Sequence, residues 1–549
     1  MRTLYVIAAI TVAALVVLVA LPTSFVALQA IFPYLGEGSL RDAFGNWPVV
    51  FGEPGLPRLL GSTLNLGLGV ALVAGLIGIP LGALRGLARI PFAALWDLLL
   101  LVPFLLPPYI VALSWTMALQ PRGYLAQLSG THLGGLLFSP TGVVLVMGLN
   151  LFPVVYFAVS RSMAASGARL ADVARVFGAS PARAFARVTL PLALPAIAAS
   201  LLLTFTLAIE EYGVPAALGS HAGVSVLTTA IERRLADWPI DLSGAALLSL
   251  LLVAIALTAY TVQRALLAGR NFETATGKPA PLTPRELGLW RLPVLLLFAV
   301  VAILAALVPV ASMVATALLR TLSGGLSASN VTLDNFSALF SSSDTLQALG
   351  TSLSLALGAA VLTGAIGFLT AWCVAGRRLK GAAAIDALAL MPAALPSIVV
   401  GVGLILAWNQ AFWPATPYGT WLILLLSYSC LLLPYPVRYV SAALAQIGPG
   451  LEAAARVHGA TLHRALLRIS LPLALPSLAA AMLMVFAVAS RELVTSLLLA
   501  PAGVQTVSTY VWQQFEQGSA GMGMAMATLA TVIGLALMLG GLKLQRASA

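Results

Sequence analysis

The stretch ADVARVFGASPARAFARVTLPLALP, residues 171–195, occurs a second time in the chain as EAAARVHGATLHRALLRISLPLALP, residues 452–476. The copies are offset by 281 positions without a gap, and fourteen of their 25 residues are identical. Unrelated segments of ordinary composition would share about two. The stretch is therefore an internal repeat, and we expect each copy to hold the same place in one half of the protein. Below, residues 171–195 are the first repeat loop and residues 452–476 the second.

Each repeat loop is polar and basic and lies between long apolar runs. Its first part, Ala171–Phe177 or Glu452–His458, is a good helix former with an acid near its start, which suits a helix N-terminus. A glycine then ends this helix or allows close backbone approach. We expect a second short helix with two arginines one turn apart, and a proline in the first turn of the next, apolar helix. These positions are held by Gly178, Arg183, Arg187 and Pro191 in the first loop, and by Gly459, Arg464, Arg468 and Pro472 in the second.

The predicted product is a bent, basic helical hairpin that projects from a membrane. One interpretation is a positively charged interfacial loop that only sets the topology. The fixed glycine and Leu-Pro positions in both copies favour a docking surface instead.

This pattern resembles the EAA loop of binding-protein-dependent ABC importer permeases, which reads roughly E-A-A-x3-G, then about nine residues, then an apolar residue and L-P. The resemblance implies that each loop forms a coupling helix inserted into a separate ATPase subunit. The acid six residues before the glycine is Asp172 in the first loop, whereas the second loop has Ala453 there and Glu452 one residue earlier. A shifted or weaker acid contact is therefore expected in the second loop.

The resemblance assigns ATPase coupling to five residues of each loop, although a general positive-inside role is an equal alternative for the arginines. They are Asp172, Ala174, Arg175, Gly178 and Arg183, and Glu452, Ala454, Arg456, Gly459 and Arg464.

The composition predicts a polytopic membrane protein, because 60% of the residues are apolar, 9% are charged and the mean hydropathy is +1.00. A net charge of +11 could suggest nucleic acid, but the charges fall between apolar spans, so we expect a lipid bilayer and no nucleic acid as partner. Cys373 and Cys430 lie in separate predicted spans, and a disulfide framework is not indicated. The apolar run from Leu4 to about Phe32 is interpreted as a retained first span.

Apolar runs predict an all-α membrane protein with about twelve transmembrane helices, six in each half. Residues 1–265 form the first predicted half and residues 291–549 the second, joined by a linker, 266–290, that is rich in Pro, Thr and Gly. The predicted spans lie near 4–32, 60–84, 97–119, 141–163, 191–212 and 243–265, and near 291–319, 348–375, 386–410, 419–441, 472–498 and 522–542.

Charge asymmetry predicts the orientation. With both repeat loops and both termini inside, 22 of the 29 Lys and Arg residues are cytoplasmic, whereas twelve of the 18 Asp and Glu residues are outside. We therefore expect a multi-pass protein of the bacterial inner membrane with both termini in the cytoplasm.

Upstream of the loops the repeat continues with an offset of 289, which predicts parallel repeats about an axis along the membrane normal. Seven pairs match, namely Gly61, Leu64, Gly75, Gly78, Asp97, Pro103 and Pro107 with Gly350, Leu353, Gly364, Gly367, Asp386, Pro392 and Pro396. Glycines three apart permit close helix packing. The Pro-x3-Pro pairs should break or kink a span, either to line a cavity or as ordinary kinked packing.

The sequence contains no G-x4-G-K-S/T motif, and Gly277-Lys278-Pro279 is not a phosphate loop. The chain therefore cannot hydrolyse ATP by the usual P-loop mechanism. The four histidines show no zinc-type pattern, and no hydrolase or transferase motif is present. We expect a transporter rather than an enzyme, without catalytic residues, bound metal or cofactor.

Ionisable residues at span ends are the remaining candidates for function. Glu210, Glu211 and Tyr212 close the predicted fifth span, and Arg491 and Glu492 close the eleventh. At the offset of 281, Glu211 aligns with Glu492 and Glu210 with Arg491. An ionisable group at membrane depth is a functional hypothesis by default, while outer residues that snorkel to water are the alternative. We expect these five residues to rim the outward mouth of a central pathway where the halves meet.

The flanks EEYGVPAALGS (210–220), VLTTAIERRL (226–235) and SRELVTSLLLAPAGVQTVSTYVW (490–512) resemble fused permeases of the ferric-iron importer type. Aminoethylphosphonate, polyamine and thiamine permeases are related to that type. The resemblance implies two copies of a cytoplasmic ABC ATPase and a periplasmic substrate-binding protein as partners, and ferric iron as cargo. Carboxylate and phenolate oxygens suit Fe³⁺. The competing class is an ion-coupled secondary carrier with two parallel six-span repeats, which leaves the twin loops unexplained.

Overall fold

The computed structural model describes residues 2–166, 168–267, 286–375, 379, 381–447 and 450–548. Apart from turns and loops, these residues form helices, and an isolated β-bridge joins Leu319 and Val331. Nine helices are long and apolar enough to cross a membrane, or up to thirteen if each bent pair is one span. The all-helical membrane class is thus confirmed. Most of the predicted linker, 268–285, lies outside the described residues.

The first half follows the predicted order, with one extra helical pair before its last span. Its main elements are α1 (Arg2–Leu15), η1 (Val16–Ala20), α2 (Leu21–Ile31), α3 (Trp47–Phe51), α4 (Leu56–Leu87), α5 (Ala93–Leu105), α6 (Pro108–Leu119), α7 (Tyr124–Ser129), α9 (Pro140–Ser166), α10 (Ala168–Val176), α11 (Pro181–Ala184), η3 (Phe185–Thr189), α12 (Leu190–Glu210), α13 (Gly213–Ala222), α14 (Leu227–Ala236) and α15 (Leu242–Leu267).

The second half repeats this order. Its main elements are α16 (Arg291–Ala302), η5 (Ile303–Leu307), α17 (Val308–Ala317), α18 (Asp334–Ser341), α19 (Ser343–Val374), α20 (Ala382–Leu390), η8 (Met391–Ala394), α21 (Ser397–Trp408), α22 (Trp421–Leu432), α23 (Pro434–Ile447), α24 (Gly450–Val457), α25 (Leu462–Ala465), η9 (Leu466–Ser470), α26 (Leu471–Ala489), α27 (Val494–Leu499), α28 (Val507–Glu516) and α29 (Ala520–Ser548).

Four π-helical turns stand two residues before a proline inside a long helical run. Proline has no N–H and its ring meets the carbonyl four residues earlier, so a widened turn lets the helix continue past it. The second short helix of each repeat loop is therefore continuous with the span that follows, where the sequence predicted a new helix start. The turns are η1 before Pro22, η3 before Pro191, η5 before Pro309 and η9 before Pro472.

The proline pairs break their spans, as the sequence predicts. The helical run Ala93–Leu105 is bent by 97° against Pro108–Ser129, and Ala382–Ala394 is bent by 113° against Ser397–Trp408. Each bend lies between the two prolines of one pair, because proline cannot donate to the helix ladder and disfavours helical backbone in the residue before it.

The matched glycines that stand three apart, Gly75 and Gly78 in the first half and Gly364 and Gly367 in the second, allow close helix packing. A Cβ atom on Gly78 would lie 2.8 Å from Val155 Cβ of α9, and one on Gly367 would lie 2.7 Å from Pro436 Cβ of α23. Real Cβ atoms do not approach so closely, so only glycine permits these crossings.

The first span of each half packs against helices of the other half. Helix α2 packs against α21 of the second half, and α17 packs against α6 of the first. Val26 shares an apolar cluster with Ile398 and Val402, while Met313 shares one with Tyr109 and Met117. The apolar core is therefore common to both halves.

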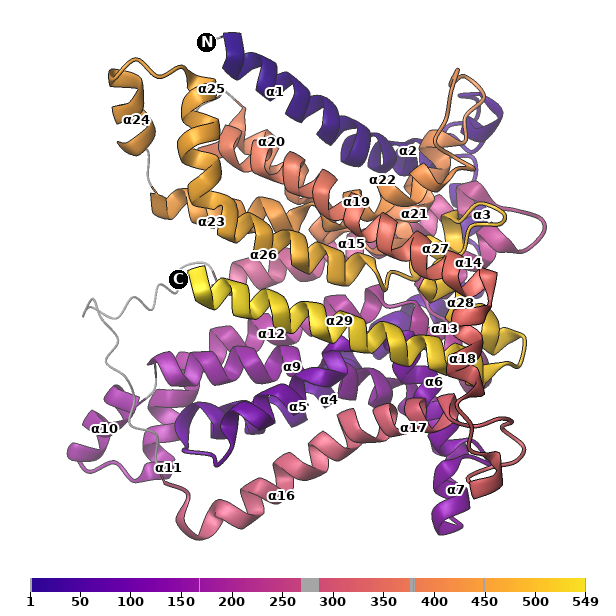
Figure 1. Cartoon of the computed structure of the whole chain (residues 1–549), viewed down its shortest axis with the longest axis vertical. Helices are drawn as coiled ribbons and strands as arrows, with labels where there is room; N and C mark the ends of the chain where they lie inside the picture. Colours follow the sequence, from indigo (N-terminus) through magenta and orange to yellow (C-terminus); the bar gives the residue numbers. More distant parts are fainter. Residues whose placement is uncertain are drawn as a thin grey trace.

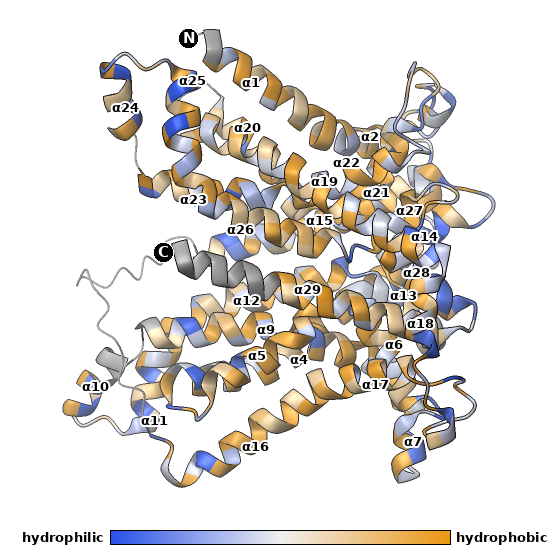
Figure 2. Ribbon diagram, in the orientation of Figure 1, coloured by the Kyte–Doolittle hydropathy of each residue, from blue (hydrophilic) through white to orange (hydrophobic). Residues whose placement is uncertain are grey.

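Figure 1 shows both repeat loops, the start of α1 and the end of α29 at one end of the helix bundle, whereas α3, α7, α14, α18 and α28 lie at the other. These are called the loop end and the far end. Figure 2 shows hydrophobic residues along the helices and hydrophilic residues gathered towards both ends. This distribution is that of a membrane-spanning bundle.

Candidate functional site

The first repeat loop folds as two short helices around one glycine. Helix α10 ends at Val176, and Gly178 follows with a φ of +89°. This left-handed conformation favours glycine and ends the helix. The Ser180 hydroxyl then accepts a hydrogen bond from the Arg183 backbone N–H at 3.3 Å and caps α11.

The second repeat loop has the same backbone. Helix α24 ends at Val457, and Gly459 has a φ of +85°. The Thr461 hydroxyl accepts from the Arg464 backbone N–H at 3.3 Å and caps α25. Of the two roles predicted for these glycines, helix termination is the one observed, because a Cβ atom on either would meet nothing within 4 Å.

The tips of both loops carry exposed apolar side chains. Val176 is 86% exposed, Phe177 is 85% exposed and Val457, which matches Val176 at the offset of 281, is 84% exposed. Apolar groups so exposed at a polar tip are typical of a surface that binds a partner. The resemblance points only to charged and small residues here, although the matched valines Val176 and Val457 carry the same signal in the sequence.

The candidate arginines of the coupling loops are all solvent-exposed. Arg175 and Arg183 in the first loop, and Arg456 and Arg464 in the second, project from the surface. Ala454 is exposed as well, and Ala174 is half-buried. The loops therefore present these cations at the loop end of the bundle.

The acids of the two loops differ in their surroundings. Asp172 is exposed and lies 3.8 Å from Arg175 within α10. Glu452 is half-buried, where its Oε1 accepts a hydrogen bond from Trp372 Nε1 at 3.0 Å and another from the Ser470 hydroxyl. Trp372 is fully buried in α19, so Glu452 connects α24 to a membrane-spanning helix.

The first half lacks the donor that holds Glu452. At the offset of 289, Trp372 corresponds to Ala83, which has no N–H on its side chain. Because Asp172 stands one register away from Glu452, the two acids also face different directions on their helices. The one-residue shift noted in the sequence thus accompanies a difference in side-chain contacts.

A second candidate region lies where α12 and α26 end. The sequence predicts spans over 191–212 and 472–498, whereas these helices end at Glu210 and Ala489, and short helices α13 and α27 follow. Glu211 Oε1 accepts from the Gly213 N–H at 2.8 Å, and Glu492 Oε1 accepts from the Thr495 N–H at 3.3 Å. Each carboxylate therefore caps the helix after the break, where it satisfies N–H groups and meets the positive end of the helix dipole.

Both capping carboxyl groups are half-buried in the breaks, within the segments 191–212 and 472–498 that the sequence predicts as spans.

The second short helix after each break, α14 or α28, lies at the far end and is called the returning helix below. Helices α13 and α14 are bent by 91° against one another. The Leu227 N–H donates to the Thr63 hydroxyl at 3.0 Å, and the Val507 N–H donates to the Ser352 hydroxyl at 2.7 Å. Thr63 and Ser352 match at the offset of 289, so both halves hold this helix start in the same way. Hydropathy does not predict the helical pair α13–α14, because α14, LTTAIERRLA, is too short and too polar for a span.

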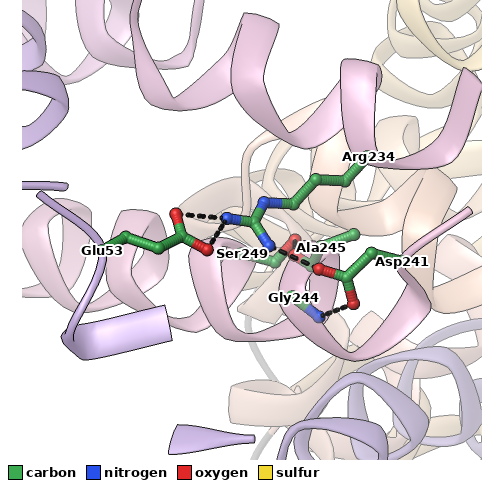
Figure 3. Close-up of polar contacts among 6 residues, drawn as sticks. All are labelled: Glu53, Arg234, Asp241, Gly244, Ala245 and Ser249. Atoms are coloured by element: carbon green, nitrogen blue, oxygen red, sulfur yellow. Dashed lines mark hydrogen bonds and ion pairs between the residues drawn. The ribbon is translucent and has the colours of Figure 1, made fainter. Parts of the chain in front are cut away.

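Arg234 anchors this returning helix in the first half (Figure 3). Its Nη2 donates to both carboxylate oxygens of Glu53, at 2.6 and 2.7 Å, and its Nη1 donates to Asp241. Asp241 also accepts from the Gly244 N–H at 2.7 Å at the start of α15. This fork of charge-assisted hydrogen bonds joins α14 to the segment before α4 and to α15.

The other candidate pathway residues occupy different positions at the two breaks. Arg491 Nη1 donates to the Leu105 carbonyl at the end of α5, across the boundary between the halves. Glu210 has a buried Oε1 that finds no hydrogen-bond partner among the described residues. Tyr212 is buried, with its ring centroid 6.4 Å from that of Trp512.

Among the cavities lined by both halves, two lie near the breaks, and a third of about 660 Å³ has an almost entirely apolar lining between α9 and α17. One of the two near the breaks, of about 610 Å³ at the far end, is lined by Tyr212, Glu232, Arg233, Trp512 and Glu516, among others. The other, of about 150 Å³, is lined by Arg491 and by residues at the α5–α6 break. Glu210, Glu211 and Glu492 line neither cavity. Within the part of the chain that the structure describes, no group of three or more His, Cys, Asp or Glu residues could hold a metal ion.

The sequence matches one protein-family model twice, over residues 74–270 and 365–546; its description is "binding-protein-dependent transport system inner membrane component". The chain is 24% identical over 501 residues to the ferric transport system permease protein FbpB of Actinobacillus pleuropneumoniae, covering 89% of this chain and 71% of the relative. It is also 24% identical over 505 residues to the Fe(3+)-transport system permease protein FbpB 2 of Haemophilus influenzae, covering 91% of each.

A shorter relative matches one part of the chain. The molybdenum transport system permease protein ModB of Escherichia coli is 29% identical over 198 residues, covering 35% of this chain and 86% of the relative. Among solved structures, a bacterial alginate ABC transporter in complex with an alginate pentasaccharide-bound periplasmic protein matches with a TM-score of 0.38 at 19% identity, covering 46% of this chain and 92% of that chain.

Proposed function

The chain belongs to the family of binding-protein-dependent transport system inner membrane components, and from this premise we propose that it forms the translocation pathway of an ATP-driven importer and couples that pathway to a separate ATPase. It is a multi-pass permease of the inner membrane that carries the family domain twice. In this proposal one polypeptide supplies the whole transmembrane unit, with halves 1–265 and 291–549 joined by the linker 266–290.

The observation that carries the proposal is the pair of matched loops with exposed apolar tips. Val176 and Val457 stand at equivalent positions at one end of the bundle and are exposed to 86% and 84%. Two equivalent tips suit two copies of one cytoplasmic ATPase. The chain has no phosphate-binding loop of its own, so the ATP would be hydrolysed by that partner.

Charge supports the corresponding orientation. If the loop end faces the cytoplasm, 22 of the 29 Lys and Arg residues lie on that side, as the positive-inside rule requires. Both termini are then cytoplasmic, and the cavity at the far end opens towards a periplasmic substrate-binding protein.

Helix continuity supports a route for the force. The helical run Pro181–Glu210 joins the first loop to the Glu211 break without interruption, and Leu462–Ala489 joins the second loop to the Glu492 break. A helix of 30 residues is about 45 Å long. We infer that closure of the ATPases moves the two loops together, and that these two helices carry the motion to the breaks and give alternating access to the cavity between the halves.

Ferric iron is the cargo best supported by the comparisons, because two relatives that cover most of the chain are named as ferric transport permeases. Aminoethylphosphonate, polyamines and thiamine are the alternatives from the sequence resemblance. A putative 2-aminoethylphosphonate permease of Salmonella typhimurium is 29% identical over 156 residues.

The proposal is tested by reconstitution of the chain in vesicles with the ATPase and binding protein encoded beside it. Uptake of ferric iron, aminoethylphosphonate, polyamines and thiamine is measured with ATP, without ATP and without the ATPase. We expect uptake of one cargo that requires both ATP and the ATPase. Uptake driven by an imposed ion gradient without the ATPase would instead establish a secondary carrier.

Deletion of residues 171–178 or of residues 452–459 tests the role of the loops in the same assay. Each deletion should stop ATP-dependent uptake while the helices still insert, which protease protection of the remaining chain can show. Uptake that survives both deletions would contradict coupling through the loops.

A further inference from the structure

The cavity of about 150 Å³ between the halves has an uneven lining. Most of its wall is apolar, and residues of both halves contribute to it. Its polar groups come from a few side chains, chiefly Tyr109, Ser490, Arg491, Ser508 and Thr531. Arg491 is the one charged residue among the described residues that line it.

Arg491 interacts electrostatically with the nearby Glu492, Tyr435 and Tyr109, but few of its N–H groups are hydrogen-bonded within the described residues. One Nη1 hydrogen bond goes to the Leu105 carbonyl at the C-terminal end of α5, and Arg491 forms no ion pair with any carboxylate of the described residues. The neighbouring acids are committed elsewhere, since Glu492 caps α27 and Glu211 caps α13. A guanidinium has five N–H donors, so most of its donor capacity remains available to a ligand.

A second group in the same wall lacks a partner. Thr531 Oγ1 is buried and has no hydrogen-bond partner in the described part of the chain, and Thr531 lines the same cavity as Arg491. Buried polar atoms without partners are uncommon in native structures and call for an explanation. A ligand that accepts from both groups would satisfy the hydroxyl and the cation together.

The architecture of the break does not require a cation. At the equivalent position the first half has Glu210, and it builds the same break with a carboxylate cap and a returning helix. The positive charge is therefore specific to one side of the pathway. This difference makes a role in ligand recognition a better explanation than a role in folding.

We propose that Arg491 recognises the cargo through an anionic oxygen group bound in this cavity, with Thr531 as a second donor. The inference rests on the import function proposed above and adds the charge of the cargo. Guanidinium binds carboxylate, phosphate and similar oxyanions through paired hydrogen bonds, and the apolar wall screens the charge weakly. The same chemistry would be offered by a free oxyanion or by ferric iron held in an anionic chelate.

Binding is measured first on the purified full-length chain in detergent. The unfolding temperature is recorded with phosphate, molybdate, aminoethylphosphonate, citrate and ferric citrate, and for the unsubstituted chain, Arg491→Gln, Arg491→Lys and Arg320→Gln. Arg320 pairs with Asp334 on the surface at 3.6 Å and is the matched control for loss of one arginine. At least one anion should raise the unfolding temperature of the unsubstituted chain and of Arg320→Gln. The rise should be smaller in Arg491→Lys and absent in Arg491→Gln.

The arms of this experiment separate the two sources of the anionic group. Stabilisation by ferric citrate but not by citrate identifies a chelate, and stabilisation by phosphate, aminoethylphosphonate or molybdate identifies an oxyanion. Stabilisation that persists in Arg491→Gln, or that occurs with none of the anions, would overturn the inference.

Uptake in the reconstituted vesicles then distinguishes this inference from the proposed function. Arg491→Gln should raise KM for the cargo about 10- to 100-fold, as expected for loss of a charged hydrogen-bonding partner, and Arg491→Lys should restore part of it. ATP-driven uptake that is unchanged in Arg491→Gln overturns the inference and leaves the import function standing. If the unsubstituted chain shows no ATP-driven uptake of any cargo, both fail.

Discussion

The two repeat loops have the same backbone and different attachments to the membrane-spanning helices. In both, a glycine with positive φ separates two short helices, and a hydroxyl caps the second. In the second loop Glu452 is hydrogen-bonded to Trp372 of α19, whereas Asp172 of the first loop is exposed beside Arg175. Duplication therefore preserved the local fold, while the side-chain contacts that orient each loop diverged.

The two helix breaks differ from the loops, because their side-chain capping contacts are the same in both halves. Glu211 and Glu492 cap the following helix in the same way, and the returning helices are held by matched hydroxyls. The two halves thus agree closely at the breaks, apart from the exchange of Glu210 for Arg491. Substitutions at matched positions should accordingly have unequal effects at the acids and the tips of the loops, and nearly equal effects at the loop glycines and at the breaks.

The largest difference is expected from the apolar tips. Val176→Asp together with Phe177→Asp removes two exposed apolar groups from the first loop, while Val457→Asp removes one from the second, where His458 replaces the phenylalanine. Burial of a Val or Phe side chain contributes about 1.5–3 kcal/mol. Affinity for the ATPase should fall more for the first pair of changes, as measured by titration of the purified partner. Equal losses would show that Phe177 makes no contact there.

Removal of the loop acids should affect the second loop more. Glu452→Ala leaves the indole N–H of Trp372 buried without its acceptor, and such a loss costs about 1–3 kcal/mol. Asp172→Ala removes, among the contacts of Asp172, its exposed pair with Arg175, which is worth about 0–1 kcal/mol. Thermal unfolding of the two variants, together with the cargo transported per ATP, checks this order. Trp372→Phe is the control from the other side of the hydrogen bond and should reproduce the effect of Glu452→Ala on coupling.

The break carboxylates should respond alike. Glu211→Gln and Glu492→Gln keep an oxygen acceptor but lose the charge that meets the helix dipole, an effect of about 0.3–1 kcal/mol on stability in each half. Uptake should fall in both variants while binding of the ATPase stays unchanged. If uptake is unaffected by either change, these glutamates have no part in the pathway.

Substitution of the two loop glycines should have similar effects, and each should destabilise its loop by about as much as one residue with a strained backbone. Gly178→Ala and Gly459→Ala force a Cβ into φ values of +89° and +85°, which costs about 1–2 kcal/mol of local stability. The cost would be felt as fraying of α10 or α24, so the measured loss of ATPase affinity should be smaller than this figure. A larger loss in one loop would indicate that its glycine touches the partner.

The smallest effects are expected for the exposed loop arginines. Arg183→Ala and Arg464→Ala remove solvated charges, and each should change ATPase binding by a few tenths of a kcal/mol that salt screens. Titrations at low and high ionic strength measure this. A loss above about 1 kcal/mol that persists in high salt would assign that arginine a direct contact.

Local signals in the sequence determined much of this protein. The two repeat loops, the glycine terminators and the proline pairs Pro103–Pro107 and Pro392–Pro396 could be recognised from residue types and spacing, because helix termination and helix breaking depend on a few neighbouring residues. Long apolar runs likewise determined the membrane class, because the bilayer sets the length of a span.

Other features were decided by the tertiary structure. The hydrogen bond between Trp372 and Glu452 joins residues 80 positions apart, and that between Arg491 and Leu105 joins residues 386 positions apart. Hydropathy also does not predict α14. Its charged residue Arg234 is held by Glu53 and Asp241, which come from other elements. Periodicity describes which face of a helix is apolar, but which elements meet is determined only when all of the spans pack together.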